Sequence, residues 1–260
     1  MNDEIKQHIR NAIRSGIRLD GRKPLEIRPI KIQTRFISTA EGSARVKFGD
    51  AEVIAGVKMA QEKPYPDTPE DGVLMVNSEL LPLSHPDFES GPPSIESIET
   101  ARVIDRGIRE SKALDTKKLC ITKGEKVWTI AIDVVPINYD GNLIDMGGLA
   151  AVLALKTATM PEVVNGVINY HKKSNTKLEL KSIPIPITIG KIGEIYIVDP
   201  TSEEEKALDG RLTITTLDDE KLCAMQKGGN APLTQKDIDR MVEIAFEKAA
   251  ELRKKVLEVK

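Results

Sequence analysis

Apolar residues recur along the 260-residue chain with two different periods, and each period predicts a different kind of element. Spacings of three and four residues predict helices over residues 2–15, 94–114, 146–158 and 234–257. Alternation of apolar and polar residues predicts strands over residues 44–59, 72–84, 126–138, 186–200 and 212–226. The first of these segments is expected to fold as a hairpin around Gly49-Asp50. Together the elements indicate an α+β protein in which antiparallel sheets pack on helices.

Polar residues at the ends of the predicted helices indicate where these helices begin. Asn2 or Asp3 is expected to cap the first helix, Asp145 the third, and Thr234 together with Asp237 the last. The third helix is apolar nearly all round, so we expect it to be buried in the centre of the molecule. The apolar stripe of the second helix is expected to consist of Ile95, Ile98, Ala101, Ile104 and Ile108.

The order of the elements suggests a division of the chain into three parts. Residues 1–17 form an N-terminal helix, residues 18–175 a first sheet-and-helix subdomain, and residues 176–260 a second one. The seam between the two subdomains is expected in residues 175–186, and no low-complexity linker separates them.

The composition is that of an ordinary globular protein, with 40% apolar and 30% charged residues. The formal net charge of −2 provides no bulk attraction to nucleic acid, so any such binding needs a local basic patch. The two cysteines form no CxxC pair, which favours reduced thiols of a cytosolic protein over a metal site. No signal peptide and no apolar run of roughly 18 residues is present, so we expect a cytoplasmic protein without membrane contact.

Two polar segments resemble catalytic or metal-binding sites. Ser84, His85 and Asp87 have the side chains of a serine-protease triad, but a triad converges from separate segments, so this proline-bound loop is expected to be inert. Residues 199–210 carry five carboxylates, which can bind Mg²⁺, although a solvated acidic loop is the favoured interpretation. We therefore predict no metal site and no cofactor from these segments.

Glycines surround the expected start of the third helix, at Gly141, Gly147 and Gly148. A helix N-terminus of this kind can cradle a phosphate with its free backbone N–H groups. This loop, however, offers no Lys, Arg, Ser or Thr, and Asp145 would repel an anion. We therefore interpret the glycines as positions where a buried helix packs closely.

Three arginines, Arg102, Arg106 and Arg109, follow one another at spacings of four and three residues and share one face of the predicted second helix. Such a row can hold successive phosphates of a single strand. Glu99 and Asp105 stand at helical spacing from Arg102 and Arg109, so pairing within the helix is an equal alternative. The residues themselves leave both interpretations open.

Five long segments, in their order along the chain, resemble the RNase PH family. They read SGIRLDGR (15–22), LPLSHPDFESGPP (81–93), ETARVIDRGIR (99–109), INYDGNLIDMGG (137–148) and VDPTSEEE (198–205). Within that family the chain is similar to the non-catalytic ring subunit of the archaeal exosome, over nearly its whole length. The resemblance implies an RNase PH-like fold whose first half is like domain 2 of ribosomal protein S5.

Active members of this family degrade RNA from the 3′ end with inorganic phosphate as the nucleophile. The resemblance implies that they bind phosphate through an arginine and a Gly-Thr-Arg or Gly-Ser-type loop, and that they use two aspartates, one of them for Mg²⁺ or acid catalysis. At the matching positions this chain carries Glu96, Leu143, Ile144, Glu205 and Arg211, or by a looser alignment Asp209. A site that loses its cations and gains an acid is expected not to support attack by phosphate.

The resemblance therefore implies a chain without catalytic residues of its own, which structures the active site of a catalytic RNase PH-like partner. Its expected partners are that subunit, in a hexameric ring of three heterodimers, RNA-binding cap subunits, and single-stranded RNA. Arg102, Arg106 and Arg109 match the basic helix of the non-catalytic subunit, which favours contact with RNA. The alternative is an active phosphate-dependent 3′–5′ exoribonuclease that uses Glu205 and Asp209 with Mg²⁺.

Overall fold

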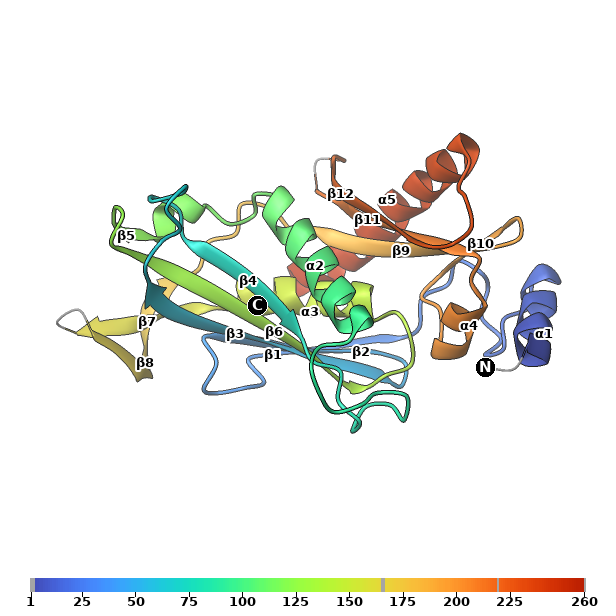
Figure 1. The fold of residues 1–260 in the computed structure, drawn as a ribbon, viewed down its shortest axis with the longest axis horizontal. Helices are drawn as coiled ribbons and strands as arrows, with labels where there is room; N and C mark the ends of the chain where they lie inside the picture. Colours follow the sequence, from blue (N-terminus) through green and yellow to red (C-terminus); the bar gives the residue numbers. More distant parts are fainter. Residues whose placement is uncertain (1–2, 165–166, 219, 260) are drawn as a thin grey trace.

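The computed structural model describes residues 3–164, 167–218 and 220–259, which form two sheets and a separate hairpin around a central helix (Figure 1). The helices are α1 (Asp3–Arg14), α2 (Ile95–Glu110), the 3-10 helix η1 (Thr116–Leu119), α3 (Leu143–Lys156), α4 (Ser202–Ala207) and α5 (Gln235–Glu258). The strands are β1 (Ile30–Thr34), β2 (Gly42–Phe48), β3 (Ala51–Glu62), β4 (Val73–Ser78), β5 (Cys120–Thr122), β6 (Lys126–Asn138), β7 (Thr159–Val164), β8 (Val167–Lys177), β9 (Ile185–Ile192), β10 (Ile195–Val198), β11 (Gly210–Thr216) and β12 (Leu222–Gly229). Among the described residues, no helix is both long enough and apolar enough to cross a bilayer.

The first sheet has the strand order β1-β2-β3-β6-β4, with β5 paired to β6. Strands β2 and β3 form the hairpin that the sequence predicts around Gly49-Asp50. The expected antiparallel strand over residues 72–84 is a wrong prediction, because β4 ends at Ser78 and runs parallel to β6. The chain passes from β4 through α2 before it returns to β6, and such a helical crossover brings two strands into parallel orientation.

The second sheet has the order β10-β9-β11-β12 and is antiparallel throughout. Residues 186–200 form the hairpin of β9 and β10, which turns at Gly193 with a φ of 59°. Helix α5 packs against β9 and β11, and the predicted capping pair of Thr234 and Asp237 is present at its start. The hairpin of β7 and β8 extends at the end of the molecule opposite α1 (Figure 1). The predicted boundary at residue 175 stays a prediction.

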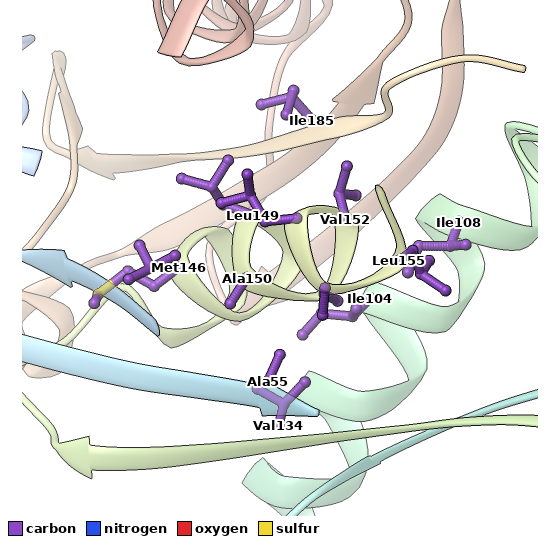
Figure 2. Close-up of a cluster of buried hydrophobic side chains, with 14 of the residues drawn as sticks. Ala55, Ile104, Ile108, Val134, Met146, Leu149, Ala150, Val152, Leu155 and Ile185 are labelled. Carbon is purple, nitrogen blue, oxygen red and sulfur yellow. The ribbon is translucent and has the colours of Figure 1, made fainter. Parts of the chain in front are cut away.

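Helix α3 lies between the two sheets and is buried over residues 143–155, as its apolar composition predicts. Figure 2 shows Leu149 pointing toward β9, which carries Ile185, whereas Ala150 points toward the strands that carry Ala55 and Val134. Each fully buried side chain of the size of leucine contributes about 2 kcal/mol to the free energy of unfolding. The helix therefore joins the inner faces of both sheets into one core.

The predicted start of α3 is wrong, and so is the expected capping role of Asp145. The helix begins at Leu143, and the residue before it, Asn142, has a left-handed backbone conformation with a φ of 57°. Asp145 lies inside the first turn and bonds to the second sheet instead. Its two carboxylate oxygens accept hydrogen bonds from the backbone N–H (2.9 Å) and the hydroxyl (2.7 Å) of Thr188. Of the two caps proposed for α1, Asn2 lies outside the described residues.

Helix α2 begins after Ser94, whose hydroxyl accepts the N–H of Ser97. It ends at Glu110, earlier than the predicted Leu114, because Lys112 adopts a left-handed backbone conformation with a φ of 51°. A non-glycine residue in that conformation cannot continue a right-handed helix.

The predicted apolar stripe of α2 is half wrong: Ile104 and Ile108 are buried, but Ile95 and Ile98 are exposed. The helix packs instead along a side that includes the small residues Ser97, Thr100 and Gly107. At that side the neighbours approach closely, since a Cβ at Gly107 would lie only 3.0 Å from the hydroxyl of Thr215. Close approach selects small side chains, and this leaves the two isoleucines on the outer face.

We expect Asp145→Asn to remove a pH-dependent loss of stability, because burial raises the pKa of Asp145 to about 7. The folded pKa lies above the unfolded value of 3.8, so this carboxyl contributes its full stabilisation below pH 3.8. The contribution is lost as the pH rises from 3.8 to about 7. The unfolding free energy of the wild type relative to the variant should fall by up to ~1.4 kcal/mol per pH unit in that window. Urea denaturation at several pH values measures it, and a pH-independent difference would contradict the assignment.

Candidate functional site

A pocket of about 330 Å³ opens where α2, α4, β11 and the N-terminus of α3 meet. It brings together the positions that the sequence matches to the phosphate and acid sites of active relatives. These residues are Glu96, Leu143, Ile144, Glu205 and Arg211. Asp209, the looser alternative, does not line the pocket and pairs with Arg10 at 2.5 Å.

Glu205 occupies the place at the start of α3 where an anion would find backbone donors. Its Oε1 accepts the N–H of Asn142 at 2.8 Å, and its Oε2 accepts the hydroxyl of Tyr139 at 2.6 Å. The same hydroxyl lies 3.2 Å from Glu96 Oε1. Desolvation raises the pKa of Glu205, against the opposite effect of the two hydrogen bonds. The chain's own carboxylate therefore uses the donors that a bound phosphate would need.

The two side chains with which α3 begins are aliphatic and cannot hold an anion. Leu143 and Ile144 are both buried where the resemblance implies a hydroxyl and an arginine. Gly141, with a φ of 75°, lets the chain pass close to α4, because a Cβ there would lie 2.4 Å from the carbonyl oxygen of Pro200. The interpretation of the glycines as packing positions is confirmed for Gly141.

The acidic segment 199–210 is not the solvated loop that we expected. Part of it folds as α4, whose first turn is held by a capping box between Thr201 and Glu204. Most of its carboxylates have partners: Asp199 and Glu204 bind arginines in the interior, and Glu205 lies at the pocket. Within the described residues, no three His, Cys, Asp or Glu side chains converge as a metal site would require. The donor set does not fit a magnesium ion.

A buried network of arginines holds this segment in place. Arg18 donates to both carboxylate oxygens of Glu204, at 2.9 and 2.5 Å, and neither side chain is exposed. Arg22 and Arg28 both bind the carboxylate of Asp199, at 2.9 and 2.6 Å. The motifs RLDGR and VDPTSEEE are therefore two halves of one ion network, which fixes α4 and with it Glu205.

Two members of the arginine row are free for a ligand. Arg102 and Arg106 line a groove of about 800 Å³ between α2 and the edge strand β4. Both are exposed, and neither forms an ion pair within the part of the chain that the structure describes. Glu99, the alternative partner of Arg102, pairs instead with Arg211 at 2.7 Å. The groove thus presents two unneutralised guanidinium groups.

Arg109, the third member, is held by the fold itself. Its Nη2 donates to Asp105 at 2.7 Å and to the carbonyl oxygen of Leu74 at 2.9 Å. The hydrogen-bonded Asp105 carboxylate raises the pKa of Arg109, against the opposite effect of desolvation.

The loop with Ser84, His85 and Asp87 is not a triad, as predicted. Ser84 donates its hydroxyl to the carbonyl oxygen of Leu81, and His85 Nδ1 accepts the backbone N–H of Asp87. Asp87 itself pairs with Lys206 at 2.6 Å. The Ser84 hydroxyl bonds to Leu81 and not to His85, so it is not activated by a base as the serine of a triad is.

One tyrosine of the site escaped the sequence analysis. Tyr139 stands at the junction of β6 and α3, and its hydroxyl links Glu96 and Glu205 across the pocket. The scarcity of aromatic residues, 3% of the chain, is the signal that could have drawn attention to it.

Comparison with known proteins finds relatives that match nearly the whole chain. Domain 1 of the 3′ exoribonuclease family matches residues 26–161, and domain 2 of that family matches residues 182–248. The exosome complex component Rrp42 of Methanosarcina acetivorans is 46% identical over 97% of this chain and 93% of its own length. Its counterpart in Pyrococcus horikoshii is 44% identical over 98% of this chain and 94% of its length.

Solved structures show the same likeness in three dimensions. A chain of the Archaeoglobus fulgidus exosome with RNA bound to the active site superposes with a TM-score of 0.90 at 43% identity, covering 97% of this chain and 98% of that chain. Rice Rrp46 has the same fold, with a TM-score of 0.69 at 18% identity, covering 93% and 99% of the two chains. The expected α+β fold is confirmed by both.

Removal of one partner from the buried pair of Arg18 and Glu204 is expected to destabilise the protein strongly. Glu204→Gln should lower the free energy of unfolding by roughly 3–5 kcal/mol, because it leaves a buried guanidinium without a counter-charge. The exposed pair of Arg240 and Glu243 offers a control, in which Glu243→Gln should cost less than about 1 kcal/mol. Urea denaturation compares the two variants, and similar losses in both would contradict the role given to the buried pair.

Proposed function

Because the chain belongs to the 3′ exoribonuclease family over both of that family's domains, we propose that it is a non-catalytic component of an archaeal exosome, a 3′–5′ exoribonuclease complex that degrades RNA. In this role it structures the active site of a catalytic RNase PH-like partner and contributes to RNA binding. Its relatives in Methanosarcina and Pyrococcus carry the name of exosome components, which supports the assignment.

The pocket at the start of α3 is the observation that carries the non-catalytic role. Attack by inorganic phosphate requires preorganised positive charge around the nucleophile and the developing transition state. Here Leu143 and Ile144 offer only carbon, and Glu205 places a carboxyl group against the backbone donor of Asn142. Each tenfold loss of rate corresponds to ~1.4 kcal/mol, so the absence of several charged contacts removes useful turnover.

The groove between α2 and β4 supports the RNA-binding role. Arg102 and Arg106 are exposed on one helix face, and their spacing of one turn matches neighbouring phosphates of a flexible strand. Arg109 is bound to Asp105 and Leu74, so we assign it to the support of the groove rather than to a full phosphate contact.

The partner in this proposal is a catalytic RNase PH-like subunit, with which the chain alternates as three heterodimers in a hexameric ring. RNA-binding cap subunits and single-stranded RNA complete the assembly. The likeness to a chain of an exosome with bound RNA supports this arrangement, because the likeness covers nearly the full length of both chains. No cofactor is part of the proposal.

The isolated chain should not degrade RNA. Incubation with labelled poly(A), inorganic phosphate and Mg²⁺ is expected to release no nucleoside diphosphate above background, because Lys206 and Arg211, the cations that line the pocket, are paired with Asp87 and Glu99. Addition of the catalytic subunit should restore degradation and serves as the positive control. Phosphate-dependent release by the isolated chain that disappears in Glu205→Gln would establish the active-enzyme alternative instead.

Replacement of both free arginines should weaken RNA binding and reduce its dependence on salt. For Arg102→Ala/Arg106→Ala in the assembled ring, the slope of log K against log salt should become shallower by about 1.4, at roughly 0.7 for each single-strand phosphate contact. Arg109→Ala should change the slope by less than the double variant does. Arg240→Ala on α5 is the control with an unaltered slope. Fluorescence anisotropy with labelled RNA measures the three variants and the unaltered chain, and an unchanged slope in the double variant would reject the role of the groove.

A further inference from the structure

The pocket at the start of α3 contains a hydrogen-bonding arrangement that the chain does not complete by itself. The Tyr139 hydroxyl lies 2.6 Å from Glu205 Oε2 and 3.2 Å from Glu96 Oε1. This hydroxyl carries one proton, so it can donate to only one of the two carboxylates at a time. We refer to Glu96 and Glu205 as the carboxylate pair. The pair offers more acceptor positions toward the pocket than Tyr139 can fill.

The cations that line the pocket do not neutralise the carboxylate pair. Lys206 binds Asp87 at 2.6 Å, and Arg211 binds Glu99 at 2.7 Å. Neither member of the pair forms an ion pair with a residue that the structure describes. Desolvation and the charge of the other member raise the pKa of Glu205, against the hydrogen bonds that it accepts. The pocket therefore carries negative charge without a counter-charge in contact with it.

A buried hydroxyl in the same pocket is also without a partner. Thr100 lines the pocket and is only 3% exposed. Over the described ranges of the chain, its hydroxyl forms no hydrogen bond. Thr100 follows Glu96 by four residues, so both side chains lie on one face of α2. Buried polar groups nearly always have a hydrogen-bond partner, and this hydroxyl therefore marks a position where a ligand can bond.

The rest of the pocket has the size and the apolar surface of a small-molecule site. Leu143 and Ile144 are buried, and Leu208 lines the pocket with them. The volume of about 330 Å³ lies within the range of roughly 300–1,000 Å³ that such sites have. Aliphatic side chains favour methylene groups over a hydrated metal ion. Among the residues that are described, no three His, Cys, Asp or Glu side chains are arranged to hold a metal.

We propose that this pocket binds a small aliphatic primary amine, namely a free diamine or polyamine. Its ammonium group has one positive charge and three N–H donors, which match the carboxylate pair and the hydroxyl of Thr100. Its methylene groups lie on Leu143, Ile144 and Leu208. An anion is a poor occupant because the carboxylate pair repels it, and a neutral molecule leaves the charge of the pair unbalanced. The inference goes beyond the proposed function, which assigns no ligand to this pocket.

The first test needs no variant and uses the full chain in isothermal titration calorimetry. 1,4-Diaminobutane should bind as one molecule per chain. 1,4-Butanediol has the same methylene chain without charge and should bind at least about 100-fold more weakly, given roughly 1.4 kcal/mol per tenfold. Mg²⁺ has charge without methylene groups and should not displace the diamine at equal concentration. Absence of diamine binding, equal affinities for the diamine and the diol, or displacement by Mg²⁺ would overturn the inference.

Three variants then locate the amine in the pocket. Glu205→Gln removes a charge but keeps an acceptor for the N–H of Asn142, and it should weaken binding of 1,4-diaminobutane by at least about tenfold. Thr100→Val keeps the shape of the side chain without its hydroxyl and should also weaken binding. Glu203→Gln is the matched control, because it removes an exposed carboxylate of α4 that does not line the pocket, and it should leave the affinity unaltered.

Far-UV circular dichroism verifies that the three variants are folded. An equal loss of affinity in Glu203→Gln and Glu205→Gln would show a general attraction of cations to an acidic surface and would reject the site. Unaltered binding in Thr100→Val and Glu205→Gln would place the amine elsewhere on the chain and would reject it as well.

Discussion

The burial of α3 between two sheets is the constraint on which the rest of this structure depends. The helix is apolar on every side, so it is stable only where both faces meet other elements, and the two sheets provide these faces. Its first turn consequently lies deep in the molecule, beside α4 and β11. Any chemistry at that turn must use the side chains that the helix itself presents, and these are Leu143 and Ile144.

Arginines in the interior of this protein are paired with carboxylates, whereas two arginines on the surface of α2 are not. In the interior, Arg18, Arg22 and Arg28 are fully engaged by Asp199 and Glu204, which fix the short helix α4. The desolvation of these ions is expensive, and it is offset only because each guanidinium meets carboxylate oxygens with good geometry. At the surface, Arg102 and Arg106 keep their charge without a partner among the described residues.

Helix α2 connects the interior with the surface, because one side of the helix packs against other elements and another side is exposed. Its packed side uses small residues, Ser97, Thr100 and Gly107, which let the helix lie close to its neighbours. Its outer side is then free to carry isoleucines near the start and arginines near the end. Glu99 stands between the two sides and pairs with Arg211, so the helix is also tied to the wall of the pocket. The pocket and the groove are thus both lined by residues of α2.

Local patterns in the sequence determined a large part of this description. Periodicity placed the long helices α1, α2, α3 and α5 and most strands, and the apolar run predicted the buried position of α3. The motif positions predicted that Leu143, Ile144 and Glu205 belong to one site. These features can be predicted from one sequence because they depend on residues that are close together along the chain.

Only the tertiary structure decided the features that depend on distant partners. Three of these features join segments that lie far apart in the chain: the parallel pairing of β4 with β6, the ion pair of Glu99 with Arg211, and the hydrogen bond from Arg109 to Leu74. The exposure of Ile95 follows instead from the side on which α2 packs. A helical stripe fixes which residues share a face, but not which face turns inward, because that choice depends on how closely the facing element approaches. The acidic segment became a buried ion network for the same reason, since its arginines lie about 180 residues away along the chain.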